Sequence, residues 1–162
     1  EIYTLSLHDA LPILVDGGSK MADIILGKPK VRGNSDVIFN YDAVADIAVG
    51  VAVKRTANEV IAAFDGTGIV MGVAGYKEVD GQKRVAVCEK GKEIGVLLDN
   101  PAEAITVGSQ VYITAAGKFT GVSTGNTATA ATFASEKGDA VNALTGARIA
   151  NGAALVDAIG GF

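Results

Sequence analysis

Residues 69–89 read IVMGVAGYKEVDGQKRVAVCE, and this stretch decides the fold class. Two valine-rich runs flank the dipeptide Asp80-Gly81. An Asp-Gly pair between strand-like runs favours a tight turn with positive φ angles, which is the strongest short-range sign of a β-hairpin. Valine and isoleucine also suit a pleated, half-buried surface. The stretch therefore predicts two antiparallel strands joined by a tight turn.

Further strand-like runs lie on both sides of this hairpin, separated by glycine or by Asn and Asp turns. They are residues 44–53, 59–64, 93–98, 107–114, 118–120, 129–133, 146–149 and 153–159. Short strands at intervals of about 8 to 12 residues are typical of an all-β sandwich or barrel. Helix signals are sparse, and residues 102–105 would form a turn at most. We expect a small β-barrel or β-sandwich of short antiparallel strands.

Two glycine-containing sites between these runs predict additional turns. Lys90-Gly91-Lys92 separates two strand-like runs, and Asn151-Gly152 separates the last two. Asn-Gly is a second strong hairpin signal, because asparagine and glycine tolerate the positive φ angles that such turns require.

The first 20 residues differ in character from the rest of the chain. Residues 1–13 (EIYTLSLHDALPI) resemble the translation of a sequencing adapter, and residues 14–20 (LVDGGSK) could be encoded by an untranslated ribosome-binding region. We therefore expect residues 1–20 to be a non-native leader and the natural protein to begin at Met21. A secretory signal is the alternative, but the segment starts with an acidic residue, where a signal peptide carries positive charge.

Residues 21–43 are predicted to form an extended N-terminal arm ahead of a β-barrel-like domain at 44–162. Pro29 disfavours helix at the residue before it and lacks a backbone donor. Between Met21 and Gly33, Lys28, Lys30 and Arg32 outnumber Asp23, so the start of the arm is basic while the whole chain has a net charge of −4. Such an arm could lie along another subunit, or it could be an ordinary edge strand with a solvated face.

The residues that chemistry usually needs are scarce. The only histidine, His8, lies in the expected leader, and the rest of the chain therefore lacks the commonest general base and metal ligand. Cys88 is the only cysteine and lies in a strand-like run, where a small buried apolar residue is more common than a nucleophile. No phosphate-binding loop, nucleophile elbow or zinc-protease motif is present. We predict no catalytic residue, no cofactor and no metal.

Composition also bears on partners. The acidic balance gives no sign of nucleic-acid binding, and no apolar run approaches the ~20 residues that a membrane-spanning helix needs. Scattered carboxylates leave open a carboxylate active site. Lys90 or Lys92, if placed at a hairpin tip, would be similar to the modified lysine of a lipoyl- or biotin-carrier domain, although the flanking residues of those motifs are missing.

Residues 105–121 (ITVGSQVYITAAGKFTG) resemble a phrase found in small capsid cement or decoration proteins of bacteriophages. Residues 68–74, 85–92 and 146–156 are similar to the same family, so the resemblance covers residues 44–162. It implies a β-barrel-like, non-enzymatic subunit that is made in the bacterial cytoplasm and binds the outside of an icosahedral capsid. There it would hold neighbouring major capsid subunits together, either singly or as a dimer or trimer.

Two segments are the expected contacts with the capsid, because one is an arm and the other is rich in threonine, alanine and glycine. The expected contact residues are Ile24, Ile25, Leu26, Lys28, Lys30 and Arg32 in the arm, and Thr124, Asn126, Thr127 and Thr129 in the second segment. Two alternatives stay open: a surface-binding module for carbohydrate or for a fibre, and a β-barrel enzyme or carrier domain.

Overall fold

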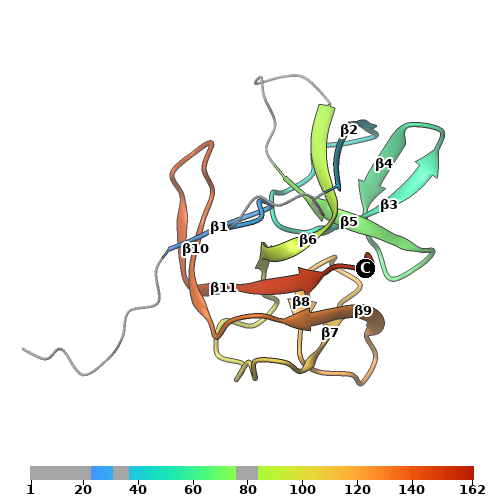
Figure 1. Cartoon of the computed structure of the whole chain (residues 1–162). Helices are drawn as coiled ribbons and strands as arrows, with labels where there is room; N and C mark the ends of the chain where they lie inside the picture. The colour runs from blue at the N-terminus through green and yellow to red at the C-terminus, as the bar shows by residue number, and fades with distance from the viewer. Residues whose placement is uncertain (1–22, 31–36, 76–83) are drawn as a thin grey trace, which may run out of the picture.

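The computed structural model describes residues 23–30, 37–75 and 84–162 of the 162-residue chain. This part of the chain contains strands β1 to β11 and no helix, so the all-β prediction is confirmed (Figure 1). None of the described segments forms a helix that could cross a membrane. The Asp80-Gly81 turn lies outside the described residues, but the strands on either side of it pair antiparallel, with Val73 opposite Cys88.

The first half of the chain forms a small closed barrel. Each strand pairs with two neighbours, because β2 pairs with β4 at one edge and with β6 at the other. The ring consists of β2 (Val37–Ala43), β4 (Val60–Ala63), β3 (Ala52–Ala57), β5 (Val70–Ala74) and the first half of β6 (Arg84–Leu97). The predicted strand at 44–53 begins only at Ala52, and residues 46–48 ahead of it have no assigned structure.

The second half of the chain forms another sheet on the far half of β6. Its strands run from β6 through β11 (Arg148–Ala158), β9 (Thr127–Phe133), β7 (Gln110–Ile113) and β8 (Phe119–Thr120). A parallel bridge between Leu98 and Phe119 brings β8 back beside the end of β6. β10 (Gly138–Val141) and β1 (Ile24–Ile25) extend this sheet beyond β11, so that the β10–β11 hairpin projects from the body (Figure 1).

β6 is one long strand that belongs to both sheets. Its residues up to Lys90 pair with β2, and its residues from Gly91 onward pair with β11. The predicted turn at Lys90-Gly91-Lys92 is therefore wrong, because these polar residues mark the point where the strand passes from one sheet to the other. Neither lysine lies at a hairpin tip, which removes the geometric basis for the carrier-domain alternative.

The Asn151-Gly152 hairpin prediction is also wrong. Both residues lie inside β11, and the hairpin turn falls instead between β10 and β11. The register passes from Gly138 opposite Ala153 to Ala140 opposite Ile149, so β11 carries extra residues in a bulge. Asn151 has a φ of 52°. A bulge can use the same positive φ that a tight turn needs, which explains why the dipeptide was misassigned.

Two main hydrophobic clusters explain why the strands are so rich in valine and alanine. β5 and the first two residues of β3 are buried on both faces, since Val53 and Ala74 point into the barrel while Ala52 and Val73 point toward the second sheet. A strand covered on both faces reads as a nearly continuous apolar run rather than an alternating one. Phe64, Phe119 and Phe133 are the largest fully buried side chains.

Residues 23–30, which we call the strap, lie on the chain's own body. The Gly27 N–H donates to the Gly95 carbonyl at 2.7 Å, and the Gly95 N–H donates to the Lys28 carbonyl at 3.0 Å. Ile24 and Leu26 pack in a third cluster with Ala140, Ala153 and Leu155. The first described part of the predicted arm is thus held by the second sheet of the same molecule.

Candidate contact surface

The polar side chains of the described residues support the fold rather than converge on one point. Among the described residues, no three or more His, Cys, Asp or Glu side chains are grouped so that they could hold a metal ion. Cys88 is buried, and its thiol donates to the Lys90 carbonyl at 3.3 Å. Several carboxylates make local contacts far apart in the fold: Asp23 with Arg148, Asp42 with Arg84, Glu103 with Thr120, and Asp157 with the Glu93 N–H.

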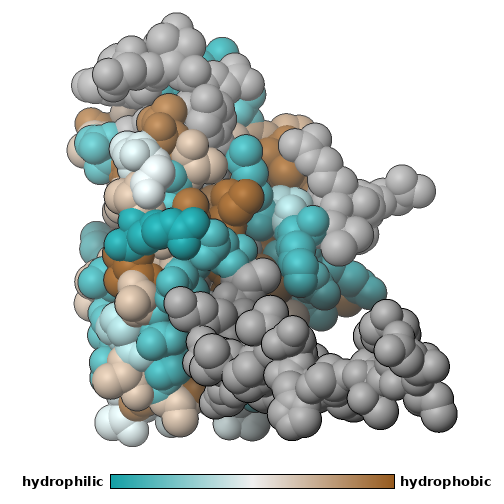
Figure 2. All heavy atoms as spheres, turned by 90° about the vertical axis from the view of Figure 1, so that its left-hand side faces the viewer, coloured by the Kyte–Doolittle hydropathy of each residue, from teal (hydrophilic) through white to brown (hydrophobic). Residues whose placement is uncertain are grey.

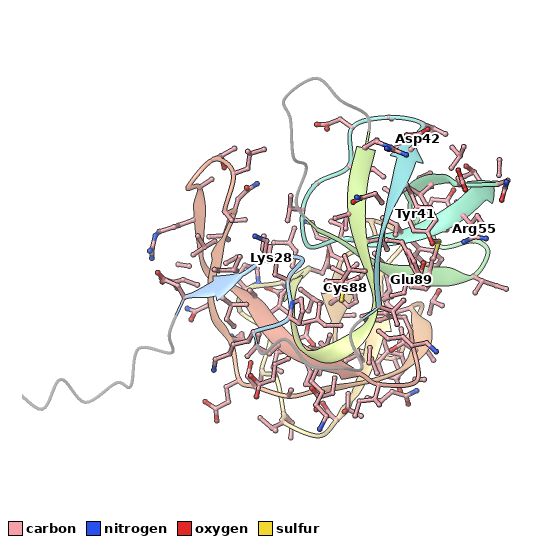
Figure 3. All side chains as sticks on the ribbon, turned by 45° about the horizontal axis from the view of Figure 1, so that its top comes forward. Lys28, Tyr41, Asp42, Arg55, Cys88 and Glu89 are labelled. Carbon is pink, nitrogen blue, oxygen red and sulfur yellow. The ribbon has the colours of Figure 1, made fainter. Side chains whose placement is uncertain are left out.

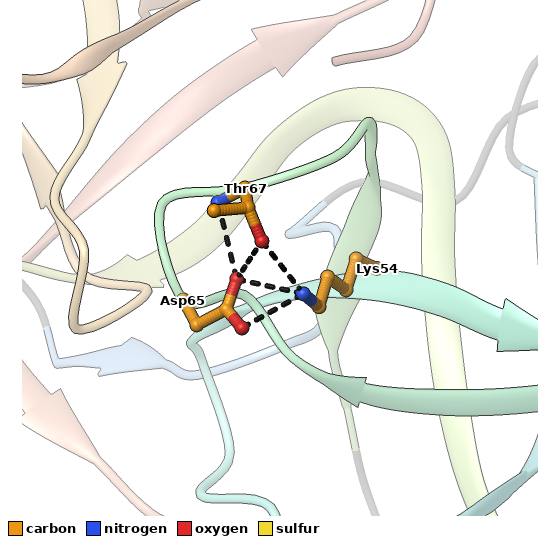
Figure 4. Close-up of polar contacts among 3 residues, drawn as sticks. All are labelled: Lys54, Asp65 and Thr67. Atoms are coloured by element: carbon orange, nitrogen blue, oxygen red, sulfur yellow. Dashed lines mark hydrogen bonds and ion pairs between the residues drawn. The ribbon is translucent and has the colours of Figure 1, made fainter.

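One such contact fixes the loop between β4 and β5, and we call it the Lys54–Asp65–Thr67 staple (Figure 4). The Lys54 ammonium donates to both carboxylate oxygens of Asp65, at 2.7 and 2.8 Å, and to the Thr67 hydroxyl at 3.0 Å. The Thr67 N–H and hydroxyl also donate to Asp65. These hydrogen bonds hold the pKa of Asp65 below its usual range, with the bond from Lys54 the largest cause. A carboxylate so engaged is suited to fixing a loop.

The strap presents only part of its predicted contact set to the surface. Ile24 and Leu26 are buried in the molecule's own core, because alternate residues of β1 and its extension face inward. Ile25, Lys28 and Lys30 are exposed. Arg32 lies outside the described residues.

The threonine-rich segment is divided in the same way. Thr124 is exposed, and Asn126 and Thr127 are half-buried. Thr129 is buried, and its hydroxyl donates to the Val111 carbonyl at 2.9 Å and accepts from the Ala131 N–H at 3.1 Å. Its side chain therefore serves the β7–β9 pairing.

The strap and the projecting β10–β11 hairpin form one region of the surface, which we call the hairpin face. It carries the exposed apolar side chains of Ile25, Leu144 and Ile149. Ile25 and Ile149 lie on opposite sides of the sheet, because Ile25 is in register with Val141 and Arg148 whereas Ile149 is opposite Ala140. Arg148 on the hairpin makes a two-pronged ion pair with Asp23 at the start of the strap, which ties the two segments together. Figure 2 shows this side of the molecule, where apolar patches alternate with hydrophilic ones.

A groove of about 310 Å³ runs beside the strap on this face. Its lining combines an apolar floor with charges of both signs, and Lys30 and Glu93 lie 3.9 Å apart. The lining residues are Asp23, Ile24, Ile25, Lys28, Pro29, Lys30, Glu93, Ala134, Ser135 and Leu155.

A second exposed region lies on β2 and its neighbours in the barrel. The Tyr41 hydroxyl donates to the Glu89 carboxylate, and the Arg55 guanidinium lies 5.6 Å from the centre of the Tyr41 ring (Figure 3). Burial, followed by Glu89, raises the pKa of Tyr41. Phe39 makes an edge-to-face contact with Tyr41 at 6.4 Å, yet it is 55% exposed. Together with Ile38, which is 41% exposed, Phe39 leaves apolar surface on both sides of β2.

The fold is similar to that of a chain in a solved structure. A chain in the structure described as "The capsid of Myoviridae Phage XM1" aligns with a TM-score of 0.64 at 20% sequence identity. The alignment covers 86% of this chain and 92% of that chain, so the likeness spans nearly the whole of both. No family model matches the sequence, and no curated protein matches it significantly.

The sequence prediction missed the exposed apolar residues outside the two expected segments. Ile38 and Phe39 fell within the predicted arm, but they lie in a paired strand of the barrel. Leu144 and Ile149 were not singled out, because the hairpin that projects them was assigned to the wrong turn. The available signal was the apolar pair Ile38-Phe39 in an otherwise polar stretch.

Proposed function

We propose that this chain is a structural protein of a bacteriophage capsid, which binds the outer surface of the shell and stabilises contacts between major capsid subunits. The observation that carries the proposal is the fold shared, over almost the full length of both chains, with a chain of a phage capsid structure. The resemblance of residues 105–121 to capsid cement proteins supports the same role.

The physical features of the surface are suited to this task. A cement needs edges, loops and projections that add contact area across a seam, whereas a bond-making site needs converging titratable groups. The hairpin face supplies exposed apolar side chains on a projection braced by the Asp23–Arg148 ion pair. Many copies on a symmetric shell would strengthen the lattice without any tight individual contact.

Binding to shells tests the proposal directly. Shells would be assembled from the major capsid protein encoded by the same phage genome, and the purified chain would be added in increasing amounts. We expect saturable co-sedimentation, density for the chain on the shell exterior by electron cryomicroscopy, and a higher temperature of shell disruption when the sites are filled.

A variant with added charge on the hairpin face separates specific attachment to the shell from non-specific adhesion. The same shells would be incubated with the Ile25→Lys/Ile149→Lys double variant, which places charge on the hairpin face without changing the core. We expect it to occupy fewer sites. Failure of the unaltered chain to bind shells at any concentration, or density only inside them, would refute the exterior cementing role.

A further inference from the structure

One edge of the barrel is only partly covered. β2 pairs with β6 along its whole length, but it pairs with β4 only at Asp42 and Ala43. The Asp42 N–H donates to the Glu59 carbonyl and the Val44 N–H donates to the Ile61 carbonyl, both at 3.0 Å, so these two residues direct their backbone groups toward β4. β4 begins at Val60, opposite Asp42, and does not reach further along β2.

The alternating direction of backbone groups along a strand shows where those of Ile38 and Asn40 point. Backbone N–H and C=O groups of successive residues point to opposite edges, so Ile38 and Asn40 direct theirs to the same side as Asp42. No described residue pairs with Ile38 or Asn40 on that side. With respect to the described residues, their donors and acceptors therefore form a short edge that could accept one extended segment, since only an extended backbone repeats its groups at the matching interval.

The side chains beside this edge are apolar and exposed. Ile38 is 41% exposed on one face of the strand, and Phe39 is 55% exposed on the other. Residues 37–41 (VIFNY) carry no charge. Natural edge strands are usually protected by lysine, proline or an inward-pointing charge, and none of these occurs within 37–41. The edge therefore suits an uncharged segment with apolar side chains.

The edge is too small to hold a partner by itself, and this limits which partner can occupy it. A stable interface between two proteins buries about 800 Å² on each partner and uses about 20 to 30 residues a side. A pairing limited to the backbone groups of Ile38 and Asn40 falls far short of this, so it would not by itself hold two copies of the chain together in solution. It can contribute where other contacts already hold the partner in place, as on a multivalent surface.

We infer that the exposed edge of β2 at Ile38–Asn40 pairs with an extended, uncharged segment of the shell subunit on which the chain sits. The inference rests on the proposed function and names the partner and the mode of contact. The occupant adds a strand to the barrel, with apolar side chains next to Ile38 and Phe39.

Two pairs of matched variants test this edge in the shell-binding assay. Asn40→Pro removes a single N–H that points away from β6, a position where an edge strand tolerates proline, and Asn40→Ala retains that N–H. Ile38→Lys places a charge beside the edge, and Ile69→Lys makes the same change at an isoleucine that is 86% exposed elsewhere. Thermal unfolding confirms that each variant is folded.

We expect Asn40→Pro and Ile38→Lys to bind shells about tenfold more weakly, the scale of one lost hydrogen bond. Asn40→Ala and Ile69→Lys should bind like the unaltered chain, and all five proteins should have the same mass by light scattering. If the unaltered chain binds shells and both edge variants bind equally well, the edge inference is wrong while the proposed function stands. A change in mass with shell binding intact would assign the edge to a second copy and overturn the inference. Absence of all binding would overturn both.

Discussion

Gly95 lies directly beneath Ile25, where the strap crosses β6. A Cβ atom added to Gly95 would come 2.1 Å from the Ile25 carbonyl oxygen, a backbone atom that cannot rotate away. The two hydrogen bonds between Gly95 and the strap require this close approach. Glycine is thus needed here because of the space available and not because of its φ angle.

We expect Gly95→Ala to lower the free energy of unfolding by about 2 to 3 kcal/mol, the usual cost of forcing an extra carbon into a packed site. Urea denaturation measures the change. Gly160→Ala is the matched control, because no atom lies within 4 Å of the added Cβ there. Equal stability of the two variants would show that the strap does not rest on β6.

The strap also shows which features of the N-terminal arm could be predicted from local sequence and which could not. Pro29 and the basic residues indicate an extended segment, and the strap pairs at residues 24–25 and at Pro29, with a turn at residues 26–27 between them. Local sequence could not show which surface the segment lies on, because Gly95, about 70 positions later, supplies the docking site. The same limit applies to β6, whose passage between two sheets depends on partners in β2 and β11 rather than on its own polar residues.

Short-range patterns predicted the class of structure better than its connections. The turn expected between the runs at 107–114 and 118–120 is confirmed and joins β7 to β8, because both strands lie within a few residues of it. The Asn151-Gly152 pair indicated a positive φ angle correctly, but this angle serves a bulge in β11 and not a hairpin turn. For the contact surface, exposure had to come from the fold: Ile24 and Ile25 are neighbours of the same type, yet one is buried and the other is not.

The inward side chains of the strap should carry its stability. Leu26 is buried, whereas Ile25 is 46% exposed. We expect Leu26→Ala to lower the free energy of unfolding by about 2 to 4 kcal/mol and Ile25→Ala to change it by less than about 0.5 kcal/mol. Chemical denaturation of the two variants measures both. If the strap instead left the body to lie on a neighbour, the isolated protein would tolerate both changes equally.

This result also bears on how shell binding should be probed. Deleting residues 21–32 would remove the buried side chains of Ile24 and Leu26 together with the exposed ones. Weaker binding by such a deletion would therefore not distinguish a lost contact from a damaged fold. Substitutions at exposed positions avoid this ambiguity.

The Lys54–Asp65–Thr67 staple should make stability depend on pH in the acid range. The pKa of Asp65 is lowered in the folded protein, mainly by the hydrogen bonds from Lys54. A lowered folded pKa stabilises the fold above the unfolded value of about 3.9, and this stabilisation is lost as the pH falls toward the folded pKa. Asp65→Asn should therefore reduce Tm at neutral pH, and the difference from the unaltered protein should shrink below about pH 4.

The size of this effect should be modest. The Asp65 side chain is 59% exposed, so solvent screens the ion pair, and we expect a decrease in Tm of about 1 to 2 °C at neutral pH. Calorimetry across the acid range measures it. Asp99→Asn is the control, since none of the described residues forms a hydrogen bond or ion pair with that carboxylate. A constant difference across pH would show that the charge of Asp65 does not contribute.

The effect of a substitution at Asn151 on stability should depend on how well the new residue tolerates a left-handed backbone. Its φ of 52° is accessible to asparagine and glycine at low cost but is strained for residues with branched side chains. The Asn151 N–H donates to the Asp139 carboxylate at 3.1 Å, which fixes the bulge against β10. We expect Asn151→Gly to retain stability within about 0.5 kcal/mol and Asn151→Val to lose about 1 to 3 kcal/mol. Because the bulge lies at the base of the projecting hairpin, the valine variant should also increase amide exchange at Ile149. Thermal unfolding and hydrogen exchange measure the two effects, and equal behaviour of the glycine and valine variants would mean that residue 151 does not adopt the left-handed conformation.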